Sequence, residues 1–228
     1  MESCVPRKPV AVCDFVSRLF RVQRPCTLKV GCVVTCALLL SIASCTPNKL
    51  PVEPSAIGSA SDLINASAEA VMAMEVGRMN LLCAQGLAGC ESQLEDSLVL
   101  LDAWAGAVRR ETERHWYRWE RNPAEFENSK GFFQMLMLGA VLVEDERVHY
   151  RDDRKISPSG SADRDGFFAD ASAVFLPGLL GQARSGTCSS MPVLYAAVGR
   201  RLGYPLRLVT TKGHLFLRWE GKGERFNI

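Results

Sequence analysis

Apolar residues recur at helical spacing between residues 61 and 143, and their pattern predicts three helices. The first runs from Ser61 to about Cys83. The second begins at the capping-box sequence Ser92-Gln93-Leu94-Glu95 and stops before Pro123, since the residue before a proline disfavours helical backbone. The third spans about Ser129 to Val143. This part of the chain is therefore expected to form a helical layer.

The pattern changes toward the end of the chain, where one helix is followed by short strands. Thr187 can cap a helix whose buried stripe reaches Leu202, and Gly203 then supplies the C-terminal cap. Cys188 would lie at the N-terminus of this helix, where the dipole favours thiolate over thiol. Strands separated by turns are predicted at 206–210, 214–219 and 224–228.

Composition adds little until the charge is divided along the chain. The 228 residues are 47% hydrophobic and 23% charged, which disfavours disordered, collagen-like and polytopic membrane proteins. Residues 1–44 hold six Lys and Arg against two acidic residues, and the remaining 184 hold 21 basic against 23 acidic residues. The body therefore lacks the basic excess typical of proteins that bind nucleic acid.

The basic N-terminal segment has the order of parts found in a signal peptide. Basic residues precede an uncharged apolar run of 14 residues, Val30 to Ala43, which is short for a bilayer span of about 20 residues. The run leads into Ser44-Cys45, and this junction looks like the bacterial lipoprotein box, whose cysteine becomes lipid-modified. We expect residues 1–44 to be a lipoprotein-type signal peptide and 45–60 a tether. A buried hydrophobic helix and a short membrane anchor are the alternatives.

The body divides into a helical region at 61–150 and a second part at 151–228. The second part opens with a polar loop, in which Asp163 and Asp165 lack the further oxygen ligands that a calcium loop needs. Cys83 and Cys90 could form a disulfide in an exported protein, but spacing leaves this open. Because the sequence stops within a predicted strand, we expect a truncated version of a longer protein.

Three residue types needed for thiol catalysis occur in the order Cys188, His214, Asn227. If Trp219 pairs with Glu224 across the last turn, Asn227 lies diagonally opposite His214, within side-chain reach. An imidazole can then take the thiol proton, the thiolate can attack an acyl carbonyl, and the amide can orient the imidazole. Gln182 is a candidate oxyanion donor beside the Cys188 amide, with a plain loop residue as its alternative.

The residues around this order resemble the bacterial transglutaminase-like core domain of the papain-like superfamily. The resemblance rests on residues 186–195 (GTCSSMPVLY), 199–205 (GRRLGYP) and 212–216 (KGHLF), and extends weakly upstream to about residue 75. It implies an α+β fold in which the cysteine-bearing helix packs on an antiparallel sheet. It also implies that Cys188 is the nucleophile, His214 the base and Asn227 the third member, a position where the family more often has Asp.

These features predict a lipid-anchored enzyme of the bacterial cell envelope. It would act on an amide or acyl group of a protein or peptide through a Cys188 thioester, with hydrolysis favoured over transfer because no residue identifies an amine site that excludes water. No metal, cofactor or nucleic-acid partner is expected. The alternative is a non-catalytic binding or scaffolding lipoprotein with the same fold.

The lipoprotein hypothesis predicts that Cys45 carries a lipid. In bacteria grown with a radiolabelled fatty acid, the wild-type chain should incorporate label and the Cys45→Ala variant should not, because lipidation requires that thiol. The matched control is Cys36→Ala, which removes a cysteine of the apolar run and should retain the label. Equal labelling of wild type and Cys45→Ala would contradict the hypothesis.

Overall fold

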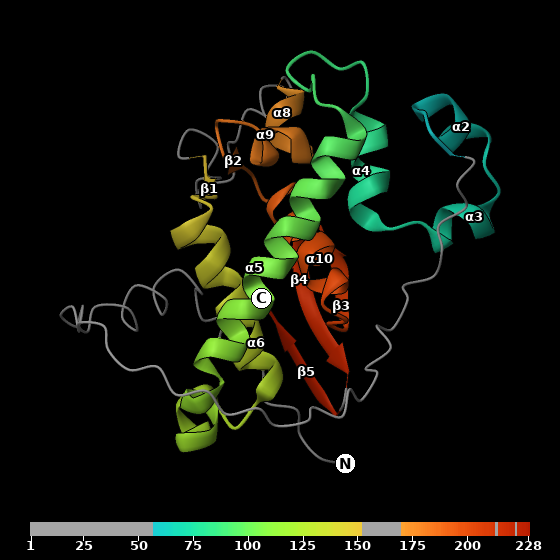
Figure 1. Cartoon of the computed structure of the whole chain (residues 1–228). Coiled ribbons are helices and arrows are strands. Elements are labelled where there is room, and N and C mark those ends of the chain that lie inside the picture. Colours follow the sequence, from blue (N-terminus) through green and yellow to red (C-terminus); the bar gives the residue numbers. More distant parts are fainter. Residues whose placement is uncertain (1–56, 152–169, 213, 222) are drawn as a thin grey trace, which may run out of the picture.

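A computed structural model describes residues 57–151, 170–212, 214–221 and 223–228. The chain mixes helices with small sheets, which confirms the α+β class at that level (Figure 1). Cys45 and the apolar run before it lie outside the described residues, as does the loop predicted at 151–166 beyond its first residue. None of the helices in the described ranges is both long and apolar enough to cross a bilayer.

The first predicted helix is wrong as a single element, because the segment forms three short helices. They are α2 (Ala60–Asn65), α3 (Ala68–Ala73) and α4 (Val76–Ala84). Each start has its own side-chain cap: Ser67 accepts from the Ala70 amide, and the Glu75 carboxylate accepts from two amides of the first turn of α4. These local side-chain bonds compete with continuation of one helix through the capping residues.

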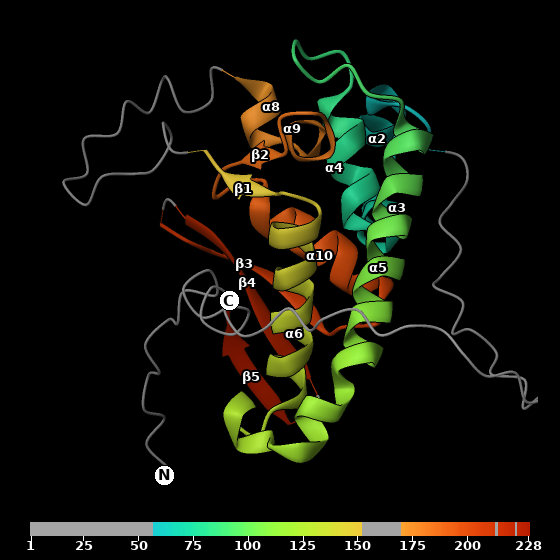
Figure 2. The same cartoon turned by 60° about the vertical axis from the view of Figure 1, so that its left-hand side comes forward.

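The second and third predicted helices are confirmed as α5 (Leu94–Arg121) and α6 (Lys130–Ala140), joined by the 3-10 helix η1 (Pro123–Phe126). They lie side by side and are linked at one end (Figure 2). The capping box is wrong, since Gln93 is the N-cap of α5 and makes no side-chain cap bond. After α6 the chain widens into the π-helical turn η2 (Val141–Asp145).

Short elements then lead the chain toward the cysteine helix. The first strand of the described chain is β1 (His149–Tyr150), which pairs in parallel with β2 (Ser185–Gly186). Between them in sequence lie α8 (Ala171–Val174) and α9 (Leu176–Leu180). The cysteine helix itself is α10 (Met191–Arg201), and Gly203 ends it with φ of 78° while the Tyr204 amide donates back to the Gly199 carbonyl.

The three predicted C-terminal strands are confirmed, but their predicted register is wrong. They are β3 (Leu206–Thr211), β4 (His214–Gly221) and β5 (Glu224–Asn227), in the antiparallel order β3-β4-β5. Gly221 pairs with Glu224, and Trp219 therefore pairs with Phe226 instead of Glu224. The cause is a tight two-residue connection with Gly223 at φ of 78°, where the sequence suggested a four-residue turn.

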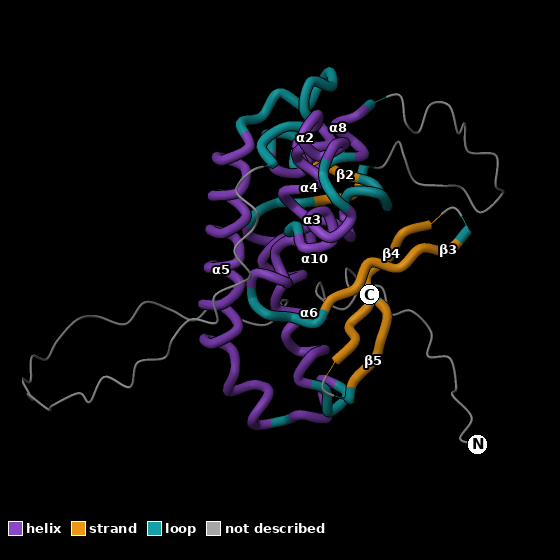
Figure 3. Tube along the Cα trace, turned by 90° about the vertical axis from the view of Figure 1, so that its right-hand side faces the viewer, coloured by secondary structure: helices purple, strands orange, loops and turns teal. Residues whose placement is uncertain are grey.

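One hydrophobic core joins the helical region to the strands. Helix α10 contacts α4 and α5 as well as β3 and β4, and the sheet lies to one side of the helices (Figure 3). Alternate residues of the strands face this core, and the residues between them form an outer face. The core includes Leu101, Trp104 and Val108 of α5, Leu194, Ala197 and Val198 of α10, and Leu206, Leu217 and Trp219 of the sheet.

A largely buried arginine, Arg201, forms ion pairs that link α10 to α4 and α5. The Arg201 side chain is 9% exposed; its Nη1 lies 3.0 Å from Glu75 Oε1 and its Nε 2.7 Å from Asp102 Oδ1. Burial opposes the charged guanidinium, but the two carboxylates outweigh it and raise the pKa of Arg201. Glu75 also caps α4, so the two ion pairs of Arg201 connect the start of α4, the N-terminal part of α5 and the end of α10.

Removing this guanidinium should destabilise the whole domain. We expect Arg201→Met to lower the free energy of unfolding by about 3 kcal/mol, because the partly buried Glu75 carboxylate loses its ion pair with Arg201. Arg114→Met is the matched control, since Arg114 is 72% exposed and its pair with Glu111 should contribute less than about 1 kcal/mol. Urea denaturation followed by circular dichroism measures both values, and equal losses would contradict the assignment.

Candidate functional site

Cys188 lies in a tightly bonded turn between β2 and α10. The flanking Thr187 and Ser190 are almost fully buried, and both hydroxyls donate to the Ala173 carbonyl of α8, at 3.0 and 2.9 Å. Ser190 Oγ also accepts from the Thr187 amide. Gly186 completes the turn, because a Cβ there would approach Ser190 Oγ to 2.6 Å. The thiol is therefore carried by backbone anchored on both sides.

Thr187 is not the N-cap that the sequence predicted, because α10 begins at Met191 with Ser190 as its N-cap and without a side-chain cap bond. The Met191 amide donates to the Thr187 carbonyl at 2.9 Å, and the Ser189 amide donates to Thr187 Oγ1 at 3.3 Å. Cys188 consequently precedes the regular helix by three residues, inside the turn that Thr187 closes.

The predicted activation of the Cys188 thiol is wrong in its direction. The residue is only partly exposed, and burial raises its pKa above the ordinary value for cysteine. Hydrogen bonds from its own amide and from the Ser189 side chain act in the opposite sense but do not overcome burial. The resting group is therefore a neutral thiol near pH 7.

His214 lies at the same end of α10 as Cys188, but on the outer face of the sheet. Strand β3 begins beside the end of α10, where the Arg200 guanidinium donates to the Leu206 carbonyl, and it runs back toward β2 (Figure 2). His214 therefore opens β4 at the end of the β3–β4 pair that lies away from the start of β3. Its imidazole is exposed and stacks on Phe216, with ring centroids 6.4 Å apart, whereas α10 packs on the other face.

Asn227 does not lie near His214. It is opposite Arg218, whose Nε donates to Asn227 Oδ1 at 2.8 Å. His214 is four residues further along β4, so the two positions are about 13 Å apart at the rise of a β-strand. The two-residue shift in register thus separates the pair that the sequence suggested, and Asn227 instead holds an arginine that also lies over the Phe216 ring.

Gln182 lies in the exposed turn between α9 and β2. No hydrogen bond connects it to Cys188 among the residues described here, so the structure does not bring the predicted oxyanion donor to the thiol. The Cys188 sulfur instead interacts with its own backbone amide and with the Ser189 side chain.

A second histidine comes closer to the cysteine turn than the sequence indicated. His149 is aligned with Ser185, so β1 runs directly beside the strand that leads into Cys188. Its Nδ1 lies 3.1 Å from the Arg147 carbonyl, and the ring is exposed. A two-residue parallel pairing leaves no periodic signal in the sequence that would identify β1 and β2 as partners.

The described part of the chain contains neither a metal-binding cluster nor a disulfide bond. No group of three or more His, Cys, Asp or Glu side chains there is placed to hold a metal ion. The three cysteines of the described residues are free thiols. Cys83 is exposed, Cys90 is buried and Cys188 is partly buried. The site therefore comprises one anchored thiol, with His214 and His149 on neighbouring elements.

Comparison with known proteins adds no relative. The chain matches no protein-family model, no curated protein and no solved structure.

The burial of Cys188 has a consequence for alkylation. We expect iodoacetamide to modify this thiol with a half-maximal rate above pH ~8.5, the ordinary value for cysteine, because burial penalises the thiolate. Peptide mass spectrometry after timed labelling across pH 6–10 measures the profile. The same peptide in urea-unfolded protein is the control and should titrate at the ordinary value. A folded-state midpoint below the unfolded one would overturn this view of the thiol.

Proposed function

We propose that this protein is a transglutaminase-like thiol enzyme that cleaves or transfers an acyl or amide group through a thioester on Cys188. The observation that supports this best is the anchored Cys188 turn ahead of α10, a helix packed against an antiparallel sheet whose β3–β4 connection returns His214 to the same end. The sequence resemblance, which implies Cys188 as nucleophile and His214 as base, is the second support for the proposal, and Asn227 and Gln182 have no part in it.

The raised pKa of the thiol decides how such a reaction would begin. A neutral thiol needs a base at the moment of attack, so an imidazole takes the Sγ proton while sulfur bonds to the acyl carbonyl carbon. The imidazolium then returns that proton to the departing amine as the C–N bond breaks, which leaves a thioester. Water then attacks the thioester carbonyl while the imidazole takes its proton; the C–S bond breaks, the free acid leaves and the proton passes to Sγ to restore the thiol. An amine that attacks in place of water gives a new amide in the same way.

His214 is the base in this proposal, and its side chain must move to reach Cys188. The imidazole is exposed at the first residue of β4, on the face of the sheet opposite α10. To serve Cys188 it must turn away from Phe216 toward the cysteine turn when substrate binds. His149, on the strand beside β2, is the competing imidazole.

The cellular setting belongs to the same proposal. A lipid on Cys45 would hold the domain at the bacterial envelope, and the substrate would be a protein or peptide there that offers an amide. Hydrolysis is favoured over transfer, as the sequence suggested, and the reaction as written needs no cofactor.

A second candidate function is a non-catalytic binding module with the same fold. Two observations favour it: burial makes the Cys188 thiolate harder to form, and the His214 imidazole lies on the face of the sheet opposite α10. In that case the cysteine turn serves packing, since its two flanking hydroxyls are buried against α8.

Acylation by an activated ester separates the two candidates. With p-nitrophenyl acetate, the wild-type protein should release a burst of p-nitrophenolate and carry a hydroxylamine-sensitive acetyl group on Cys188 by mass spectrometry. Cys188→Ala should abolish this adduct, and Cys83→Ala, which removes an exposed thiol, should leave it unchanged. A wild-type protein without a Cys188 thioester would favour the binding module.

The base is tested in the same assay. His214→Ala should slow Cys188 acylation by about 100-fold, the effect of losing a positioned general base. His149→Ala is the matched control and should remain within twofold of wild type. The opposite ranking would assign the proton transfer to His149 and contradict the role of His214.

A further inference from the structure

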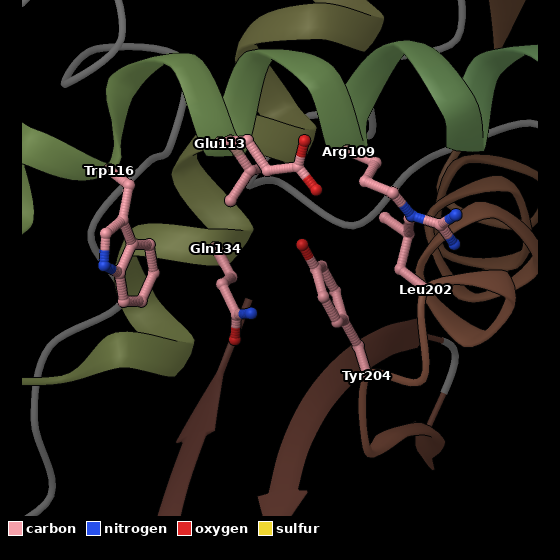
Figure 4. A pocket seen from close by; sticks show the side chains of 7 residues that line it. Arg109, Glu113, Trp116, Gln134, Leu202 and Tyr204 are labelled. Carbon is pink, nitrogen blue, oxygen red and sulfur yellow. The ribbon is translucent and has the colours of Figure 1, made fainter. Parts of the chain in front are cut away.

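A pocket of about 410 Å³ opens between α5, α6 and the loop that connects α10 to β3 (Figure 4). It lies at the opposite end of α10 from the cysteine turn. The 11 residues of that helix place about 16 Å between the two sites at the rise of an α-helix. The pocket is therefore distinct from the candidate thiol site. Its lining residues are Arg109, Thr112, Glu113, Trp116, Gln134, Leu202 and Tyr204.

Opposite charges stand one helical turn apart on its wall. Arg109 and Glu113 both project from the pocket side of α5, and Figure 4 shows the Glu113 carboxylate directed toward the Tyr204 hydroxyl. Neither charge forms an ion pair within the described parts of the chain, and the order of arginine before glutamate is the less favourable one for pairing along a helix. The pocket thus offers one cation and one anion to a ligand.

The remaining lining is aromatic and aliphatic, with neutral polar groups between. Tyr204 is 8% exposed and packs against Trp219 with ring centroids 5.5 Å apart. Burial raises the pKa of its phenol, against smaller opposing effects of the Thr112 hydrogen bond and the Arg109 charge, so the group is a neutral hydroxyl. Trp116 and Leu202 supply apolar walls, and Gln134 supplies an amide from α6.

From this arrangement we propose that the pocket binds a free α-amino acid with an apolar side chain. Arg109 receives the carboxylate, Glu113 receives the ammonium group, and the side chain packs between Trp116, Leu202 and the Tyr204 ring. A simple anion would be repelled by Glu113, and a simple amine by Arg109. A ligand with both charges can pair with both Arg109 and Glu113. The cavity volume falls in the range of small-molecule sites.

The test uses L-phenylalanine and its two singly charged analogues in isothermal titration calorimetry with the full chain. Phenethylamine lacks the carboxylate and 3-phenylpropanoate lacks the ammonium group. We expect L-phenylalanine to bind at least about 10-fold more tightly than either analogue, which corresponds to the loss of one charged hydrogen bond. No detectable binding of L-phenylalanine, or equal binding of all three, would overturn the proposal.

Two neutral variants connect the preference to the named side chains. Arg109→Gln should weaken L-phenylalanine by about 10-fold and abolish the preference over phenethylamine, while Glu113→Gln should abolish the preference over 3-phenylpropanoate. Arg110→Gln is the matched control, because Arg110 is exposed on α5 outside the lining and should leave all affinities unchanged. Unaltered preferences in the first two variants would contradict the assignment.

The outcome is independent of thiol chemistry. Cys188→Ala, which removes the nucleophile of the proposed reaction, should bind L-phenylalanine as wild type does. A loss of affinity in that variant would contradict the separation of the two sites.

Discussion

The structure depends on the close packing of α10 against α4, α5 and the sheet at the same time. Small residues make this possible: a Cβ on Gly77 of α4 would lie 3.1 Å from Ala197, and Gly199 leaves room for Leu206 of β3. The buried charges of Arg201 and Glu75 lie at the same junction. Packing alone would favour close approach at several rotations of α10, whereas an ion pair with fixed geometry selects one of them.

This constraint places both candidate sites, because each lies at one end of α10. The turn before the helix carries Cys188, and the loop after it carries Tyr204 into the pocket beside α5. The ends differ in chemistry. The hydroxyls of Thr187 and Ser190, bonded to the Ala173 carbonyl, flank the thiol, whereas the pocket presents Arg109 and Glu113, which form no ion pair with any described residue, beside aromatic rings. A neutral thiol needs fixed placement and a base at the moment of attack, whereas a binding pocket needs charged groups that can interact with a ligand.

Local signals in the sequence predicted the elements that such signals control. Pro123 and Gly203 correctly marked the ends of helices, and strand alternation identified β3, β4 and β5. The signals failed where several residues compete, as between Ala60 and Ala84, where Ser67 and Glu75 cap new helices within an apolar stripe that looks continuous. The pocket could not be predicted at all, because Arg109 and Tyr204 meet through packing between elements distant in sequence.

The register of the last hairpin explains why Asn227 and His214 lie on the same face of the sheet but too far apart to form the predicted triad. A shift of two residues preserves the face of every side chain, because the period of a strand is two. Asn227 and His214 therefore do share the outer face of the sheet, as expected, while the shift moves Asn227 by about 7 Å along β4. That displacement is larger than the reach of an amide side chain, and Arg218 occupies the position that pairs with it. The alternation of the strands therefore predicted which side chains share a face, but the geometry of the turn determines which of them are in contact. As a result the His214 imidazole stacks on Phe216, and the Cys188 thiol remains neutral.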